Sequence, residues 1–166
     1  MIQYTHSLGN KKLLGEIIMG IDFVNLKCSL FNGLSSSELD QIAAVCQEQV
    51  YKAGELIAMQ GILGNELFII DTGCVEILVD DKTNPNLKST LAILGKGQII
   101  GEMGMMDETP RPVTVRAMDE PTIIQIIPYV DIQALCQKNT QIGFTVMSNL
   151  AAEISLKLRR VNYPSF

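Results

Sequence analysis

The sequence predicts a mainly β protein: a jelly-roll barrel of about eight strands with a short inserted helix, flanked by N-terminal helices and a long C-terminal helix. Three observations predict this fold. The hydrophobic period changes from three-to-four residues to two near Gln49, short β-branched segments then alternate with glycine turns as far as Pro128, and a helical stripe of apolar residues follows.

Length and composition indicate a single domain. A chain of 166 residues with 47% hydrophobic composition is long enough to bury a substantial core. We expect N-terminal helices over residues 1–47, the β-barrel over 48–128 and C-terminal helices over 129–166.

The N-terminal part is predicted to be helical. Apolar residues between positions 11 and 34 favour one or two short helices, with a break near Ile21 and Asp22. Ser35 and Glu38 have the spacing of a capping box, so a further helix is expected to begin there and to end around Gln47.

The barrel strands are predicted from period-two segments separated by glycines, and the polar stretch from Asp80 to Asn86 is predicted to be an exposed hairpin loop. The expected strands are Gln49–Lys52, Glu55–Met59, Glu66–Asp71, Cys74–Asp80, Lys88–Leu94, Gln98–Ile100, Val113–Met118 and Thr122–Ile127.

Two helices are expected after the barrel, a short one over Val130–Gln137 and a long one over Thr140–Val161. The long one carries an apolar stripe at helical spacing. The stripe either folds back on the barrel or meets its copy in a second subunit, and we favour the homodimer. Its members are Met147, Leu150, Ala151, Ile154, Leu158 and Val161.

Charge argues against nonspecific nucleic-acid binding. The net charge is −5 and the isoelectric point is about 4.8, so there is no basic face to release counterions from a phosphate backbone. The local basic cluster of Lys157, Arg159 and Arg160 is typical of a solvated helix face. No run approaches the roughly 18 apolar residues of a membrane span, and Glu16 interrupts the one segment that resembles a signal sequence.

Cysteine and histidine usage argues against a metal centre. The cysteines at 28, 46, 74 and 136 have no Cys-x-x-Cys spacing, so we interpret them as reduced thiols in a cytoplasmic protein. His6 is the single histidine, which disfavours both a metal or haem site and a metal-dependent jelly-roll enzyme.

The segment from Gly101 to Thr114 has the features of an anion pocket. Gly101 and Gly104 allow close backbone approach at the start of a short helix, where free N–H groups and the helix dipole favour negative charge. Arg111 can add a bidentate guanidinium. Glu102 fits if the ligand also offers a hydroxyl, as a sugar phosphate does. The competing interpretation is a surface loop with a solvated arginine, in which the methionines at 103, 105 and 106 fill the core.

These features together resemble the cyclic nucleotide-binding domain, the module of bacterial catabolite-activator proteins and of regulatory subunits of cyclic-AMP-dependent protein kinase. The resemblance covers roughly residues 30–161. It rests on residues 30–34 (Leu-Phe-Asn-Gly-Leu), 53–57 (Ala-Gly-Glu-Leu-Ile), 60–61 (Gln-Gly), 67–76 (Leu-Phe-Ile-Ile-Asp-Thr-Gly-Cys-Val-Glu), 97–102 (Gly-Gln-Ile-Ile-Gly-Glu) and 109–111 (Thr-Pro-Arg).

The resemblance implies a role for each matching residue. Glu102 would accept a hydrogen bond from the ribose 2′-hydroxyl, while Arg111 and the Gly104 N–H would bind the cyclic phosphate. Ile77 and Leu91 would wall the base. The remaining residues of the expected ligand-binding set are Gly101, Met103, Pro112 and Val113, and Val161 or Asn162 lies near the position of a residue that covers the base.

Pro112 departs from the family, which usually has Ala, Ser or Thr there. Proline has no backbone N–H, so one phosphate donor is lost. A hydrogen bond to a charged group contributes roughly 1.5–3 kcal/mol, which corresponds to binding weaker by about ten-fold to a hundred-fold. The missing hydroxyl favours cyclic AMP over cyclic GMP.

Two functions remain open. The first is a non-enzymatic sensor that binds a cyclic mononucleotide and signals through its terminal helices. The alternative is a degenerate, ligand-free domain that serves as a dimerisation or protein-interaction module. Because three residues follow Tyr163, we expect no helix-turn-helix and no DNA binding, and an output that passes to an effector protein.

Overall fold

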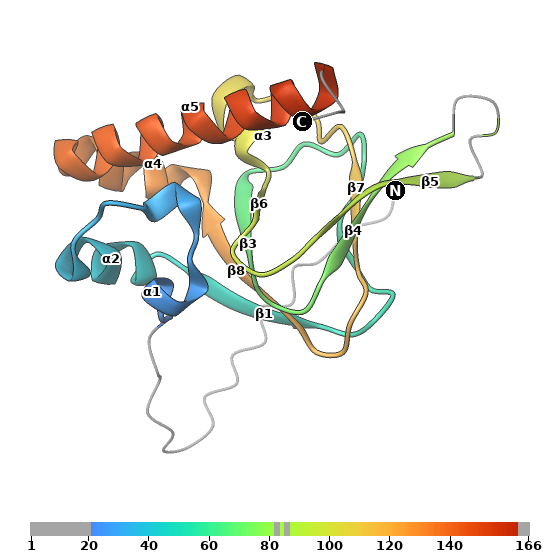
Figure 1. Ribbon diagram of the computed structural model, residues 1–166, viewed down its shortest axis with the longest axis horizontal. Helices are drawn as coiled ribbons and strands as arrows, with labels where there is room; N and C mark the ends of the chain where they lie inside the picture. The colour runs from blue at the N-terminus through green and yellow to red at the C-terminus, as the bar shows by residue number, and fades with distance from the viewer. Residues whose placement is uncertain (1–20, 82–83, 85–86, 163–166) are drawn as a thin grey trace, which may run out of the picture.

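The two sheets of this protein are packed face to face, and the helices gather on one side of them (Figure 1). The computed structural model describes residues 21–81, 84 and 87–162, and all of their side chains except those of Val24, Asn25, Val161 and Asn162. The helix expected before Ile21, most of the 80–86 loop and the side chains of both candidate base-covering residues lie outside this description.

The predicted fold class and each of the predicted strands are confirmed. The strands agree with the expected segments within two residues at each end. They are β1 (Gln47–Tyr51), β2 (Leu56–Ala58), β3 (Glu66–Thr72), β4 (Val75–Asp80), β5 (Lys88–Leu94), β6 (Ile99–Ile100), β7 (Thr114–Ala117) and β8 (Thr122–Pro128).

The strand order is that of a jelly roll. One sheet has the order β1-β8-β3-β6, the other has the order β2-β7-β4-β5, and the paired strands run antiparallel. The apolar faces of both sheets meet in a barrel core. Its buried members are Ala58, Phe68, Ile70, Val75, Ile77, Ile100, Val115 and Ile124.

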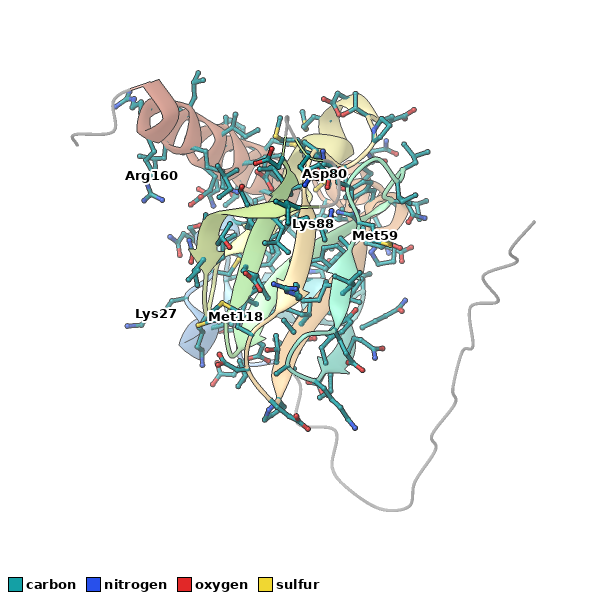
Figure 2. The ribbon with its side chains drawn as sticks, turned by 90° about the vertical axis from the view of Figure 1, so that its right-hand side faces the viewer. Lys27, Met59, Asp80, Lys88, Met118 and Arg160 are labelled. Carbon is teal, nitrogen blue, oxygen red and sulfur yellow. The ribbon has the colours of Figure 1, made fainter. Side chains whose placement is uncertain are left out.

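The outer faces of the two sheets differ. Helices cover the outer face of the β1-β8-β3-β6 sheet, where Leu67, Ile69 and Ile127 belong to a second core. Figure 2 shows the outer face of the other sheet, with Asp80 and Lys88 near one end and Met118 toward the other. The covering elements are α1 (Phe23–Leu26), η1 (Ser29–Phe31), α2 (Ser36–Ala43), α4 (Tyr129–Lys138) and α5 (Thr140–Asn162).

The helix after the capping box begins as predicted and ends early. The Glu38 carboxylate accepts hydrogen bonds from the Ser35 N–H and hydroxyl, each at 2.8 Å. The expected end at Gln47 is wrong, because α2 ends at Ala43 and Gln47 already pairs with Ile126 of β8. Tighter i→i−3 hydrogen bonds from Val45 and Cys46 complete the turn between them.

The apolar stripe of α5 divides into two parts. Leu150 is buried, and Met147 and Ile154 pack against the helical core, so the first part folds back on the chain's own sheet. Leu158 is 59% exposed, and its neighbour Leu156 is 48% exposed. The last turns of α5 therefore extend past the core, beside the short helix α3 (Glu102–Asp107) (Figure 1).

Candidate functional site

The inserted helix α3 begins at a position that only glycine fits. Gly101 precedes it with a φ of 94°, a left-handed conformation, and a Cβ there would lie 2.7 Å from the Glu66 carbonyl oxygen. The first N–H groups of a helix have no acceptor within the helix. Those of Glu102, Met103 and Gly104 are therefore available at this end of α3.

Arg111 lies against this end of α3. Its side chain is 10% exposed, and its Nη2 donates to the Glu66 carboxylate at 3.0 Å and to the Glu66 carbonyl oxygen at 3.2 Å. Its Nη1 lies 3.1 Å from where a Gly101 Cβ would be. The interpretation of this segment as a loop with a solvated arginine is therefore wrong, and Pro112 does not turn the guanidinium outward.

Two further residues shape the space around the guanidinium. Its central carbon lies 4.6 Å from the centroid of the Phe68 ring, a cation–π contact. A Cβ on Gly64 would lie 2.3 Å from Arg111 Nε, so the absence of a side chain at Gly64 makes room for the arginine. Phe68 also belongs to the barrel core and so joins it to the anion pocket.

The backbone of Arg111 is held by the loop after β2. The Gly61 N–H donates to the Arg111 carbonyl at 2.8 Å, and the Arg111 N–H donates to the Ile62 carbonyl at 2.9 Å. These two hydrogen bonds fix the backbone of Arg111 and so the direction in which its side chain points.

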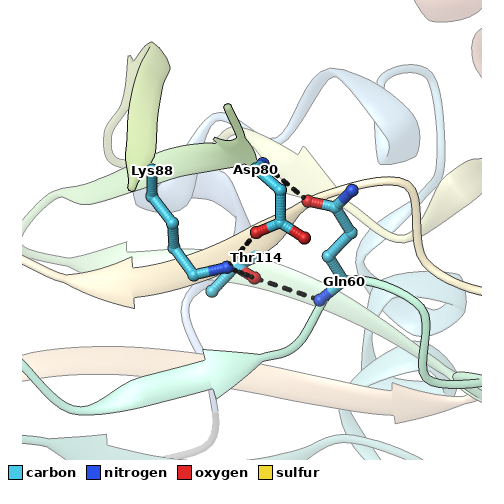
Figure 3. Close-up of polar contacts among 4 residues, drawn as sticks. All are labelled: Gln60, Asp80, Lys88 and Thr114. Atoms are coloured by element: carbon cyan, nitrogen blue, oxygen red, sulfur yellow. Dashed lines mark hydrogen bonds and ion pairs between the residues drawn. The ribbon is translucent and has the colours of Figure 1, made fainter. Parts of the chain in front are cut away.

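A polar network fixes the same loop to the strands (Figure 3). The buried Thr114 hydroxyl accepts from the Gln60 N–H at 3.1 Å, and Gln60 Oε1 accepts from the Asp80 N–H at 3.0 Å. Lys88 pairs with Asp80 and reaches Thr114 at 3.5 Å. The network therefore connects the Arg111 segment to the β4–β5 hairpin.

Glu102 is buried and paired with the C-terminal helix. It is 5% exposed, and its Oε1 lies 2.8 Å from Lys157 Nζ, which also donates to the Ile99 carbonyl at 3.3 Å. Arg159 and Arg160 are exposed, as the interpretation of this cluster as a solvated helix face predicts, whereas Lys157 is partly exposed and pairs with a buried carboxylate.

Tyr129, the first residue of α4, lies against the start of α3. Its hydroxyl donates a hydrogen bond to the Gly101 carbonyl. Cβ atoms added to Gly101 and Gly104 would lie 3.2 and 3.0 Å from this hydroxyl oxygen. Burial raises the pKa of Tyr129, and the charge of Arg111 opposes that shift. The tyrosine therefore stays a neutral donor beside the anion pocket.

The residues expected to wall the base are not all brought together. Ile77 is buried in the barrel core, and Val113 packs against that core. Leu91 is 65% exposed, because a register shift in the β4–β5 pairing makes it the extra residue of a bulge. Ala92 instead pairs with Ile77 and packs against the core.

The three methionines of the segment also differ from expectation. Met105 is buried in the helical core, whereas Met103 and Met106 are 53% and 59% exposed. The prediction that all three fill the core is therefore wrong for two of them. Met103 lies on the exposed side of the first turn of α3, and Pro112 is also exposed.

Comparison with known proteins identifies the family. The family model described as "Cyclic nucleotide-binding domain" matches residues 48–139, more than half of the chain. The chain belongs to the cyclic nucleotide-binding domain family.

Curated proteins share sequence with this chain. The cyclic AMP receptor protein of Thermus thermophilus is 31% identical over 134 residues, covering 80% of this chain and 58% of the relative. The cAMP-dependent protein kinase regulatory subunit of Schizosaccharomyces pombe is 29% identical over 106 residues, covering 59% of this chain and 24% of the relative. This chain therefore spans 58% of the length of the first relative and 24% of the length of the second.

A solved structure of the family has the same architecture. The catabolite activator protein of Thermus thermophilus superposes with a TM-score of 0.71 at 30% identity, covering 81% of this chain and 60% of the solved one. Within the described residues no helix has the length and apolarity needed to cross a membrane, and no three His, Cys, Asp or Glu side chains gather as metal ligands would.

The structure adds site residues that sequence reasoning missed. Four residues contact Arg111 or the start of α3 from at least 28 positions away in the sequence: Glu66, Phe68, Tyr129 and Lys157. Gly64 carried a weak signal, as a glycine two residues before a strand, but the arginine that needs its space lies far away in the sequence.

Proposed function

We propose that this chain is a cytoplasmic, non-enzymatic sensor of a cyclic mononucleotide. One observation carries the proposal: the guanidinium of Arg111 is held, almost fully buried, against the glycine that opens α3. A guanidinium beside the free N–H groups of a helix start is a strong arrangement for a phosphate.

The ribose is assigned to Glu102. Lys157 occupies one carboxylate oxygen, Oε1, in the ion pair. An ionised carboxylate has two oxygens that each accept hydrogen bonds, so Oε2 can accept from the 2′-hydroxyl while Lys157 keeps the charge of Glu102 compensated. The Gly104 N–H, with those of Glu102 and Met103, would complete the phosphate contacts.

The base is assigned to the apolar barrel wall near Ile77 and Val113. Ala92 takes the place on β5 that the resemblance assigns to Leu91. These side chains carry no hydrogen-bonding groups and accept either purine. We favour cyclic AMP over cyclic GMP, because Pro112 provides no hydroxyl.

The signal is proposed to leave through the terminal helices. Lys157 connects α5 to the ribose carboxylate, and Tyr129 connects the first turn of α4 to the phosphate-binding turn. A ligand that alters either contact changes the relative stability of two helix positions. Leu156 and Leu158, exposed beyond the core, support a homodimer or an effector protein as the receiver.

A second candidate is the ligand-free scaffold. Pro112 supports it, and so does the fact that both cationic side chains near α3 already have carboxylate partners. A scaffold would form a stable dimer and bind no nucleotide.

Isothermal titration with cyclic AMP and then cyclic GMP, each up to millimolar concentration, distinguishes the two. The sensor predicts saturable binding of one nucleotide, tighter for cyclic AMP, that Arg111→Ala abolishes while the variant remains folded. Absence of heat from both nucleotides with folded wild-type protein would refute the sensor and leave the scaffold.

A further inference from the structure

Glu66 holds the arginine of the anion pocket. Its carboxylate accepts from Arg111 Nη2 at 3.0 Å, and the Asn65 side-chain amide, oriented to satisfy its hydrogen bonds, donates to both Glu66 carboxylate oxygens at 2.7 and 3.1 Å. The Glu66 side chain is 31% exposed. A carboxylate is thus fixed within the pocket that would receive a phosphate.

The geometry leaves one edge of the guanidinium for a ligand. The hydrogen bonds that the Arg111 side chain makes to described residues use Nη2, whereas Nη1 faces Gly101 at the start of α3. A guanidinium has five N–H donors in a planar fork. A phosphate at Nη1 and the Glu66 carboxylate at Nη2 can therefore bind the same arginine at once.

Charge then limits which phosphate fits. The positive charge of Arg111 is compensated by Glu66, and that of Lys157 is compensated by Glu102. A ligand phosphate at Nη1 would consequently share the Arg111 guanidinium with the Glu66 carboxylate at Nη2. The repulsion from that carboxylate grows in proportion to the charge of the phosphate.

We infer that Glu66 is a specificity-determining residue, which makes the pocket accept a singly charged phosphodiester and reject a doubly charged phosphomonoester. This inference rests on the proposed function and names the property by which the site separates a cyclic nucleotide from its linear 5′-monophosphate. Glu66 acts through Arg111 and through its own charge, and it does not contact the base.

The test compares three ligands of equal base and ribose: cyclic AMP with one negative charge, 5′-AMP with nearly two at pH 7.5, and uncharged adenosine. A phosphomonoester loses its second proton near pH 6, so 5′-AMP is close to a dianion at this pH. Calorimetric titrations are made with the wild type and with Glu66→Gln, which keeps the shape and an acceptor for Arg111. Asp40→Asn, on the exposed side of α2, removes the same charge at a distance.

We expect Glu66→Gln to improve the affinity more for the ligand that carries the larger negative charge. If Glu66→Gln improves the dissociation constant for cyclic AMP by about five-fold, that for 5′-AMP should improve by about 25-fold, since the electrostatic free energy doubles with ligand charge. Adenosine binding should not change, and Asp40→Asn should leave all three ligands within about two-fold of the wild type, because solvent and salt screen a distant exposed charge. A merely structural role for Glu66 would alter all three ligands alike.

The outcomes separate this inference from the proposed function. Equal effects on the charged ligands, or none, in a wild type that binds cyclic AMP would overturn the role of Glu66 and leave the sensor intact. If Glu66→Gln binds cyclic AMP and the wild type does not, the role of Glu66 is supported and sensing by the natural chain is refuted. Binding by neither protein would overturn both. Should Glu66→Gln fail to fold, Glu66→Thr, which suits a strand, replaces it.

Discussion

Lys157 of α5 and Glu102 of α3 form an ion pair in which Nζ and Oε1 are 2.8 Å apart, although 55 positions separate the two residues. Glu102 is 5% exposed, whereas the Lys157 side chain is 39% exposed. The buried partner depends on the pair more than the exposed one, because a buried carboxylate without a partner is costly. The pair joins the proposed ribose site to the last turns of the C-terminal helix.

Removing this lysine should destabilise the protein. We expect Lys157→Met, which keeps the aliphatic stem, to lower the free energy of unfolding by about 1–2 kcal/mol, less than for a fully buried pair because solvent screens Lys157. Urea unfolding measures the change. Arg159→Met, two positions along the same helix and exposed, is the control and should cost less than about 0.5 kcal/mol. Equal losses for the two variants would show that the ion pair does not stabilise the fold.

Gly64 should be required for the position of Arg111 and not for the fold. An added Cβ would overlap the guanidinium at 2.3–2.5 Å. Since this overlap is with a side chain, Gly64→Ala should displace Arg111 and weaken cyclic AMP binding by about ten-fold or more. Gly95→Ala is the matched control, because its Cβ would meet Cys74 Sγ at an ordinary 3.7 Å. Unchanged binding by a folded Gly64→Ala would mean that the arginine does not need this space.

Pro112 should limit affinity. Pro112→Ala restores a backbone N–H next to Arg111 and is expected to tighten cyclic AMP binding by about ten-fold to a hundred-fold. The affinity for adenosine, which has no phosphate, should stay the same in this variant. Both are measured by calorimetric titration. A gain for adenosine as large as that for cyclic AMP would place the effect in backbone flexibility rather than in a phosphate donor.

The sequence predicted the strands well because their signal is local. Alternation and glycine turns lie within a few residues of one another, and each expected strand is present. The pairing of Lys157 with Glu102 and that of Arg111 with Glu66 join residues 55 and 45 positions apart, and no local pattern encodes such distances.

Errors at single residues have physical causes as well. The family resemblance assigns Leu91 to the base wall, but Leu91 is the extra residue in the β4–β5 pairing and is exposed, while Ala92 pairs with Ile77. The helical periodicity of the sequence continues past Ala43, and it therefore predicts a helix that is too long. The helix ends at Ala43 because Gln47 already pairs with β8.

The buried thiols should make stability fall at high pH. Burial raises the pKa of Cys28 from 9.0 to about 11 and that of Cys46 from 9.0 to about 12. A thiol is neutral when protonated, so the unfolded chain ionises first. The stabilisation is complete below about pH 9 and is lost as the pH rises through 9 toward 11.

Urea unfolding at pH 8.0 and 10.5 measures this effect. The free energy of unfolding should fall over this interval by about 2–4 kcal/mol for the two thiols together, an order-of-magnitude value. Cys28→Ala should lower stability at pH 8.0 and show a smaller fall. If the free energy of unfolding of Cys28→Ala falls as steeply as that of the wild type, other groups cause the pH dependence.

The most direct measurement is the crystal structure of the wild-type protein with cyclic AMP at saturating concentration. We expect the cyclic phosphate within hydrogen-bonding distance of Arg111 Nη1 and the Gly104 N–H, and the ribose 2′-hydroxyl on the Glu102 carboxylate. We also expect Glu66 to remain on Nη2. A nucleotide bound elsewhere, or one whose phosphate contacts neither Arg111 nor α3, would contradict the proposed site.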